Sequence, residues 1–435
     1  FRPPGRGLTM SNAKPAPLAK GAWYTLIILT LVYVSNSIDR TVMSILIEPV
    51  KAEFQLSDSQ LGVLTGLAFG LTYALAGLPM GWLIDRVNRT KLLAAVVAIW
   101  SVCTSICGFA QSYPALVMAR LAVGASESAA APTAMSMIAD LFPKERRSTA
   151  MGIFWTSTAF GTATSLLLGG VIAANYGWRA AFFVAGVPGL ILAVLIFLTV
   201  REPARERDLG GRADEPAPTP LQTLRFVCAN PTVFHAFIGV GLASLAMSGV
   251  PVWAASFLVR TQGFTLPQAG LMAGLGVGLF GALGSLLGGP IGDRVVRRWG
   301  VQTLPAVPMT ACVLACASGL VFALSGSLLV VALAFIVFEI VSRAFTAPAY
   351  AILVTGVEPR MRGVVVSSVQ AVTNLIGYGV GPLVVGVVSD RVGGPHSLKF
   401  GIAAVMIFSL WSGLHFLAAW FAARRSQRFA EGVAE

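Results

Sequence analysis

The chain alternates long apolar stretches with short polar segments. Six apolar stretches cover residues 22–48, 57–84, 91–111, 113–139, 147–174 and 179–200, and six more cover 233–259, 267–292, 302–323, 326–353, 362–390 and 398–423. At 1.5 Å per residue of α-helix, each is long enough to cross the roughly 30 Å hydrocarbon core of a bilayer. The pattern therefore predicts an all-α membrane protein with twelve transmembrane helices in two sets of six.

A polar segment separates the two sets of helices. Residues 201–232 are rich in proline, arginine and acidic residues, which is typical of a linker. We predict a tail at 1–20, an N-terminal six-helix bundle at 21–200, this linker, a C-terminal six-helix bundle at 233–423 and a second tail at 424–435.

The composition supports a membrane location. Hydrophobic residues make up 56% of the 435 residues and charged residues 11%, whereas soluble domains carry about 25% charged residues. The net charge of +12 would suggest nucleic-acid binding in a soluble domain. Here the basic residues cluster in short loops, so we interpret the charge as a sign of membrane topology and expect no nucleic-acid partner.

The basic residues also indicate an orientation. Of the 31 Lys and Arg residues, only five fall in the loops of one side, at Lys51, Arg179, Arg260, Arg391 and Lys399, while most others fall in the tails, the linker and the opposite loops. Positive charge is retained on the cytoplasmic side of membranes. We therefore predict a multi-pass protein of the inner (cytoplasmic) membrane with both termini in the cytoplasm.

Two adjacent charges, Asp39 and Arg40, interrupt the first apolar stretch. Each central charge costs roughly 2.5–3.5 kcal/mol on insertion scales, so these residues need partners and indicate a functional site. In straight helices Asp39 lies about 6 Å and Arg120 about 9 Å from the mid-plane on the same side. Glu127 follows Arg120 by seven residues and shares its helix face. We expect these three side chains to converge on one cavity.

An acid–arginine cluster of this kind suits proton coupling. A carboxyl group gives up its proton readily beside an arginine and holds it in an apolar site, so rearranging the pair moves a proton. We predict Asp39 as the proton carrier, Arg120 as its partner and Glu127 as the second titrating group. The alternative is a structural ion pair that fixes helix register.

The charges inside the apolar stretches also include Arg40, Glu339 and Arg343. Arg40 points about 100° away from Asp39 around the helix, toward a neighbouring helix or outward. Glu339 and Arg343 are four residues apart, a spacing that permits an intrahelical ion pair. That pair is either structural, or Arg343 contacts an anion or gates the pathway. With Arg120 and Glu127, these three residues complete our candidate substrate-binding set.

A loop motif occurs twice. Gly81-x3-Asp85-Arg86 is followed 208 residues later by Gly289-x3-Asp293-Arg294. A plain positive-inside loop explains the cations but not the repeated Gly and Asp. Internal duplication of a six-helix unit is typical of secondary transporters. We expect Gly81, Asp85, Arg86, Arg89, Asp293 and Arg294 to control the conformational change.

Signals for catalysis are absent from the sequence. It contains no Walker motif, nucleophile triad or metal-ligand spacing. The pairs Cys103-x3-Cys107 and Cys312-x3-Cys316 lack the neighbours of a metal site and fit buried apolar residues. We expect neither enzyme activity nor a cofactor nor a metal.

The motifs resemble the major facilitator superfamily and, within it, a bacterial homologue of the spinster-like lipid transporters. The resemblance rests on Asn36-x2-Asp39-Arg40, Asp85-Arg86-Val87-Asn88-Arg89, Arg120 with Glu127, Ala131-Pro132-Thr133 and Ile138-Ala139-Asp140-Leu141-Phe142. It implies alternating access by two rocking bundles, and proton-coupled transport of a lysolipid or a sphingosine-phosphate-like molecule. The expected partners are a small amphipathic substrate, protons and membrane lipids, and the expected unit is a monomer.

Two other transport functions remain open from the sequence. The chain could carry small organic anions or export drugs, because related folds carry many substrates. A lipid-modifying enzyme, a sensor or a channel fits less well, since the charged set lies near the mid-plane and the duplicated, glycine-rich helices suit rocking.

Overall fold

The computed structural model describes residues 21–84, 86–204, 220–358 and 361–432, and these residues form helices and loops without a β-strand. The N-terminal bundle consists of α1 (Ala22–Ile45), α2 (Ile47–Phe54), α3 (Asp58–Gly62), the π-helical turn η1 (Val63–Leu67), α4 (Ala68–Ile84), α5 (Arg89–Gly108), α6 (Tyr113–Glu127), α7 (Ala130–Leu141), α8 (Lys144–Tyr176) and α9 (Trp178–Thr199). The prediction of an all-α membrane protein is confirmed.

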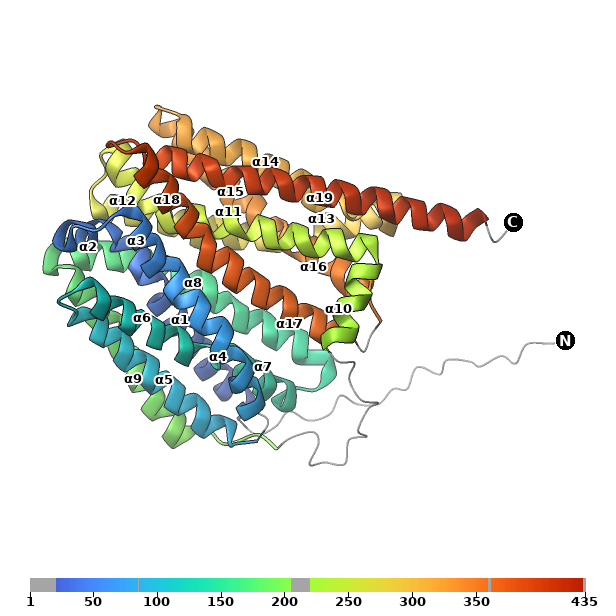
Figure 1. Cartoon of the computed structure of the whole chain (residues 1–435). Coiled ribbons are helices and arrows are strands. Elements are labelled where there is room, and N and C mark those ends of the chain that lie inside the picture. The colour runs from blue at the N-terminus through green and yellow to red at the C-terminus, as the bar shows by residue number, and fades with distance from the viewer. Residues whose placement is uncertain (1–20, 85, 205–219, 359–360, 433–435) are drawn as a thin grey trace.

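The C-terminal bundle repeats this plan (Figure 1). It consists of α10 (Pro220–Ala229), α11 (Pro231–Gln262), α12 (Leu266–Gly274), the π-helical turn η3 (Leu275–Phe280), α13 (Gly281–Trp299), the 3₁₀ turn η4 (Val301–Thr303), α14 (Ala306–Leu324), α15 (Leu328–Ala344), α16 (Thr346–Thr355), α17 (Arg362–Val372), the π-helical turn η6 (Thr373–Val380), α18 (Gly381–Val392) and α19 (Leu398–Gly432). In each bundle a π-helical turn joins two helices of the second span.

Within the described ranges, eleven helices are long and apolar enough to cross a membrane. The remaining predicted span, residues 113–139, is divided, because α6 ends at Glu127 and α7 begins at Ala130. Ser126 and Ser128 donate hydrogen bonds to backbone carbonyl groups of the preceding turn, and Pro132 in the first turn of α7 has no N–H to donate. The fourth span is therefore broken at the level of Glu127.

Two helices differ from the predicted parts. The predicted linker contains α10, whose Thr223 and Val227 are buried and which packs against α11 and α17. The last span continues as α19 past residue 423, because its Ala- and Arg-rich end favours helix. The hydrophobic pattern did not predict α10 or the end of α19, because a helical segment outside the bilayer needs no apolar stretch of membrane length.

The two bundles contact each other mainly toward one end. We call this the far end, where α2, α3 and α12 lie, and we call the other the termini end, where α11 begins and α19 ends (Figure 1). Across the two bundles, α3 contacts α18, α8 contacts α12, and both η1 and α4 contact η6. These contacts bring the charged part of α1 next to the C-terminal bundle.

Glycines show how the spacing between the bundles changes along their length. A Cβ atom on Gly66 would lie 2.7 Å from the carbonyl oxygen of Gly379, and one on Gly386 would lie 2.2 Å from that of Asp58. Toward the termini end, a Cβ atom on Gly77 or Gly289 would meet no atom within 4 Å. The helices thus touch through their backbones at the far end and diverge toward the termini end.

Candidate functional site

The structure brings Asp39, Arg120 and Glu127 together in the interior of the N-terminal bundle. The first two are fully buried and Glu127 is almost so. Arg120 Nη1 donates a hydrogen bond to the backbone oxygen of Asp39 at 3.1 Å, and Nη2 donates to that of Arg40 at 3.4 Å. The arginine therefore holds the backbone of α1, whereas we expected it to pair with the Asp39 carboxylate.

The carboxyl groups of Asp39 and Glu127 form no hydrogen bond of ordinary geometry among the described residues, although Trp100 lies near the first and Asn36 near the second. Glu127 acts electrostatically on Asp39, and Arg120 acts on both. Arg40 also acts on Glu127. A buried polar group without a partner is costly to the fold and usually serves a function. Asp39, Glu127 and Arg120 thus form one electrostatically connected cluster inside the bundle.

A cavity of about 100 Å³ lies between the two bundles. Of the candidate residues, Arg40 and Arg343 line it, whereas Asp39, Arg120, Glu127 and Glu339 do not. The wall from the N-terminal bundle is mostly polar and the wall from the C-terminal bundle mostly apolar. The lining residues are Tyr33, Asn36, Ser37, Arg40, Thr41, Ser44, Thr65, Phe69, Thr158, Thr162 and Leu166, then Met247, Ser248, Pro251, Val252, Val277, Arg343 and Tyr378.

Arg40 reaches across to the C-terminal bundle. Its guanidinium carbon lies 4.0 Å from the ring centre of Tyr378, 4.8 Å from that of Phe69 and 5.7 Å from that of Tyr73. Its Nη2 donates a hydrogen bond to Asn374 Oδ1 at 3.1 Å. Cation–π contacts and one neutral acceptor offset the burial of the charge without a carboxylate. Arg40 thus remains available to an anion in the cavity.

Arg343 faces the same cavity from α15. Its Nε lies 3.8 Å from Glu339 Oε2, so the predicted pair forms at the edge of ion-pair distance. Arg343 also interacts with Tyr378, which lies against Arg40. Two cations from opposite bundles therefore flank one tyrosine. We did not predict Tyr378, which lines the cavity, or Asn374, which accepts the Arg40 hydrogen bond, although both are polar residues in a glycine-rich apolar stretch.

An ionic cluster joins the bundles at the far end, and we call it the far-end latch (Glu48, Lys51, Asp58, Arg260, Ser389 and Asp390). Arg260 of α11 lies 2.8 Å from both Glu48 Oε1 and Asp58 Oδ2. Asp58 is buried and also pairs with Lys51. Arg260 and Asp58 come from different bundles, so their contact holds the far end closed.

Asp390 completes the far-end latch from α18. Its carboxylate accepts hydrogen bonds from the backbone N–H groups of Asp58 at 2.8 Å and Ser59 at 2.7 Å. These N–H groups have no acceptor within α3, because they lie at the positive N-terminus of the helix. Ser389 Oγ adds a hydrogen bond to Asp58 Oδ2 at 2.6 Å. The sequence argument counted Lys51 and Arg260 only as loop charges, although acids within or beside the same loops are a signal of pairing.

A separate ion pair fixes α2 within the N-terminal bundle. Glu53 accepts hydrogen bonds from Arg179 at 2.6 and 2.7 Å and from the Trp178 indole at 2.6 Å. The Arg179 guanidinium and the indole hold the pKa of Glu53 below its ordinary value. This anchor ties α2 to the start of α9, outside the far-end latch.

Arg89 lies at the centre of a buried ionic cluster at the termini end. Its Nε donates to Glu202 Oε1 at 2.8 Å, its Nη1 donates to Ser136 at 2.8 Å and to Asp140, and its Nη2 donates to the Pro203 oxygen at 2.8 Å. These contacts join α5, α7 and the segment after α9. Arg89 therefore ties the N-terminal bundle together internally.

The other motif residues face open space. Arg86 is exposed and its guanidinium stacks on the Trp82 ring, 4.1 Å from the ring centre. Asp293 and Arg294 are exposed on α13, and a Cβ atom on Gly81 would meet no atom within 4 Å. Asp85 lies outside the described residues. The repeated motif thus occupies the diverging end of both bundles.

We expect Arg89→Ala to destabilise the protein by about 3–5 kcal/mol, because it leaves Glu202 and Asp140 without their buried partner. Thermal unfolding in detergent measures this loss. Arg86→Ala is the matched control, since the same loop loses one exposed cation and should unfold at nearly the wild-type temperature. Equal melting temperatures for the two variants would contradict the structural role of Arg89.

Metal chemistry has no support in the described part of the chain. No group of three or more His, Cys, Asp or Glu side chains could hold a metal ion there.

Comparison with known proteins places this arrangement in a family. The model of the Major Facilitator Superfamily matches residues 29–382. The chain belongs to the major facilitator superfamily. It is therefore a multi-pass membrane transporter rather than an enzyme.

Individual members of the superfamily agree with this assignment. An MFS-type efflux pump of Mycolicibacterium smegmatis is 29% identical over 414 residues, covering 94% of each chain. A D-galactonate transporter of Escherichia coli is 28% identical over 312 residues, covering 67% of this chain and 71% of its own length.

Crystal structures of a bacterial homologue of the human lysosomal transporter spinster confirm the resemblance to spinster-like transporters. The inward-facing unoccupied form superposes with a TM-score of 0.80 at 27% identity, covering 93% of this chain and 97% of that one. The inward-facing occupied form gives 0.81 at 26% identity with the same coverage.

Proposed function

We propose that this transporter is a proton-coupled carrier that moves an amphipathic anion, of the lysolipid or sphingosine-phosphate type, by alternating access. It works as a monomer in the inner membrane with both termini in the cytoplasm. The observation that carries the proposal is the pair of guanidinium groups, Arg40 and Arg343, which face one cavity from opposite bundles.

The anionic headgroup is the part of the substrate that this cavity suits. Arginine binds carboxylate and phosphate groups through paired hydrogen bonds, and neither Arg40 nor Arg343 is fully neutralised by a close carboxylate. A cavity of about 100 Å³ holds a headgroup but not an acyl chain. The acyl chain would lie against Met247, Val252 and Val277 only after the two bundles part and widen this cavity.

Proton coupling is assigned to the cluster beside the cavity. Arg40 connects the two sites, because its backbone oxygen accepts a hydrogen bond from Arg120 while its side chain lines the cavity. An anion that pulls the Arg40 side chain into the cavity also changes the electrostatic potential at Glu127. Protonation of Asp39 and Glu127 and binding of substrate are thereby linked through one short segment of α1.

Alternating access follows from the asymmetry between the two ends. The far-end latch closes one end, while the glycines of the termini end face open space. With both termini in the cytoplasm, this state is open to the cytoplasm. Transport then requires the latch to break and the termini end to close.

We expect Asp58→Asn to open the far end, because it weakens the ion pair with Arg260 and with Lys51. A single cysteine at Thr41 in the cavity reports this change through its labelling rate by a membrane-impermeant thiol reagent added from the far side. The labelling rate of this cysteine should be several-fold higher in the Asp58→Asn variant than in the protein that keeps Asp58. Glu53→Gln, which keeps a hydrogen-bond acceptor outside the latch, is the control, and equal labelling in both would contradict the latch.

A second candidate, transport of small organic anions, is favoured by one observation. The cavity is small and two arginines line it. The similar D-galactonate transporter carries, by its name, a small organic anion. Counterflow in proteoliposomes separates the two. Lysophosphatidate and sphingosine phosphate should exchange, and hexonates should not. Exchange of hexonates alone would show that the substrate is a small organic anion. Exchange of neither class would reject both candidates.

A further inference from the structure

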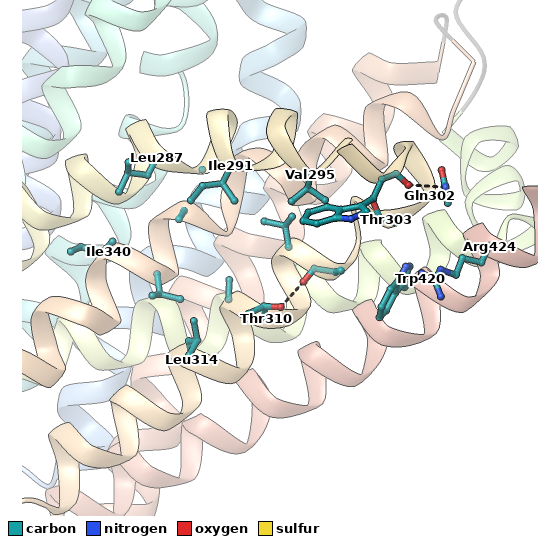
Figure 2. A pocket seen from close by; sticks show the side chains of 17 residues that line it. Leu287, Ile291, Val295, Gln302, Thr303, Thr310, Leu314, Ile340, Trp420 and Arg424 are labelled. Carbon is teal, nitrogen blue, oxygen red and sulfur yellow. Dashed lines mark hydrogen bonds between the residues drawn. The ribbon is translucent and has the colours of Figure 1, made fainter. Parts of the chain in front are cut away.

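A second and larger hollow lies on the C-terminal bundle, and we call it the C-bundle groove. It has a volume of about 620 Å³ and lies between α13, α14, α15 and α19 (Figure 2). It shares no lining residue with the central cavity. The size falls within the range of small-molecule sites, about 300–1,000 Å³. The transport pathway proposed above does not use this groove.

Most of the C-bundle groove is apolar and faces outward. Leu287 and Ile291 on α13 are 41% and 44% exposed, and Leu314 on α14 is 49% exposed. In Figure 2 the side chains of Leu287, Ile291 and Val295 form a row along one side of the groove. These exposed apolar side chains lie on helices that are long and apolar enough to cross a membrane, so we place this surface against the hydrocarbon of the bilayer.

The groove has one polar mouth, at the termini end. Trp420 and Arg424 of α19 lie there, and Gln302 and Thr303 lie opposite them (Figure 2). From Trp299 back to Leu287 the helix rises about 18 Å, close to the roughly 15 Å depth of one leaflet. The groove therefore spans a single leaflet, with its polar groups at the level of the headgroups.

Two polar groups of the mouth, on Trp420 and Arg424, are donors for which the described residues supply no acceptor. The Trp420 indole nitrogen is buried and has no hydrogen-bond partner among the described residues. The Arg424 guanidinium stacks on the same indole, 4.4 Å from the ring centre, and no described carboxylate lies within ion-pair distance of it. Arg297 and Arg298 on α13 are exposed at the same end. An indole N–H and a cation side by side suit a phosphate oxygen.

We propose that the C-bundle groove binds one phospholipid with an anionic headgroup. One acyl chain lies along Leu287, Ile291 and Leu314, and the phosphate accepts hydrogen bonds from Trp420 and Arg424. The apolar length selects a membrane lipid over a soluble anion, and the cluster of cations selects an anionic headgroup over a zwitterionic one.

Native mass spectrometry of the purified full chain tests the site, with dioleoyl phosphatidylglycerol and dioleoyl phosphatidylcholine as probes. The wild type should retain one phosphatidylglycerol molecule in preference to phosphatidylcholine. Arg424→Gln should weaken retention of phosphatidylglycerol about fivefold, the factor expected for one basic residue at a membrane surface. Trp420→Phe keeps an aromatic ring, removes the indole N–H and should give a smaller loss.

Two further variants make the test specific. Lys399→Gln removes one cation from the same helix at the far end and should leave the preference unchanged. Thr310→Phe fills the groove, and because Thr310 bonds only to Ala306 of its own helix, it should abolish retention without unfolding the bundle. Equal retention of both lipids, equal effects of Arg424→Gln and Lys399→Gln, or full retention by Thr310→Phe would each overturn the proposal.

Discussion

Asp39→Asn is expected to abolish proton-driven uptake in proteoliposomes while leaving the fold intact. The substituted amide has almost the same shape but cannot release or take up a proton in this site. Asp39 is fully buried and Trp100 lies near its carboxyl group. An amide oxygen can accept a hydrogen bond from the Trp100 indole as a carboxylate oxygen can, so the substitution keeps the local packing. The loss should therefore appear in transport and not in thermal unfolding.

The measurement is uptake of labelled substrate with and without an imposed pH gradient. Driven uptake by Asp39→Asn should fall to the level of protein-free liposomes, while counterflow exchange without a gradient should persist. Glu53→Gln is the matched control, because it also removes one carboxylate but at an exposed ion pair, and it should keep driven uptake. Undiminished driven uptake by Asp39→Asn would remove this residue from the mechanism.

The second large effect is expected at the two cavity arginines. Arg40→Gln or Arg343→Gln should lower the affinity for an anionic amphipath roughly 10- to 100-fold, because a charged hydrogen bond is worth about 1.5–3 kcal/mol. Affinity for an uncharged analogue of the same chain length should change little. Tryptophan fluorescence or thermal-shift titration in detergent measures both affinities.

Arg120 provides the comparison for these variants. Arg120 belongs to our candidate substrate-binding set, but it does not line the cavity and it binds backbone oxygens of α1. Arg120→Gln should therefore disturb proton coupling and stability more than anion selectivity. A selective loss of anion affinity in Arg120→Gln, with none in Arg40→Gln, would show that Arg120 and not Arg40 binds the anion.

The meeting of Asp39, Arg120 and Glu127 could be predicted from the sequence because it depends on quantities local to two helices. Helix rise fixes the depth of each residue, and a seven-residue spacing fixes a shared face. The atoms that bond could not be predicted in the same way. Arg120 binds the backbone oxygens of Asp39 and Arg40, and that choice depends on the rotation of each helix about its axis.

Contacts between the two bundles could not be predicted from the sequence. The bond from Arg40 to Asn374 joins residues 334 positions apart, and it exists only when η1 and α4 pack on η6. The far-end latch has the same origin, because Asp58 meets Arg260 only when that end is closed. Such contacts belong to one conformation of a moving protein, whereas hydrophobic pattern and spacing describe features common to every conformation.

The glycine contacts at the far end have a consequence for the speed of the cycle. Gly62, Gly66 and Gly70 meet the opposite helix through backbone atoms, so parting these surfaces frees no rotamers and rejoining them freezes none. The helices can separate and reseal without a search among side-chain arrangements. A methyl group at any of these positions would hold the bundles apart, so the far end could not close completely.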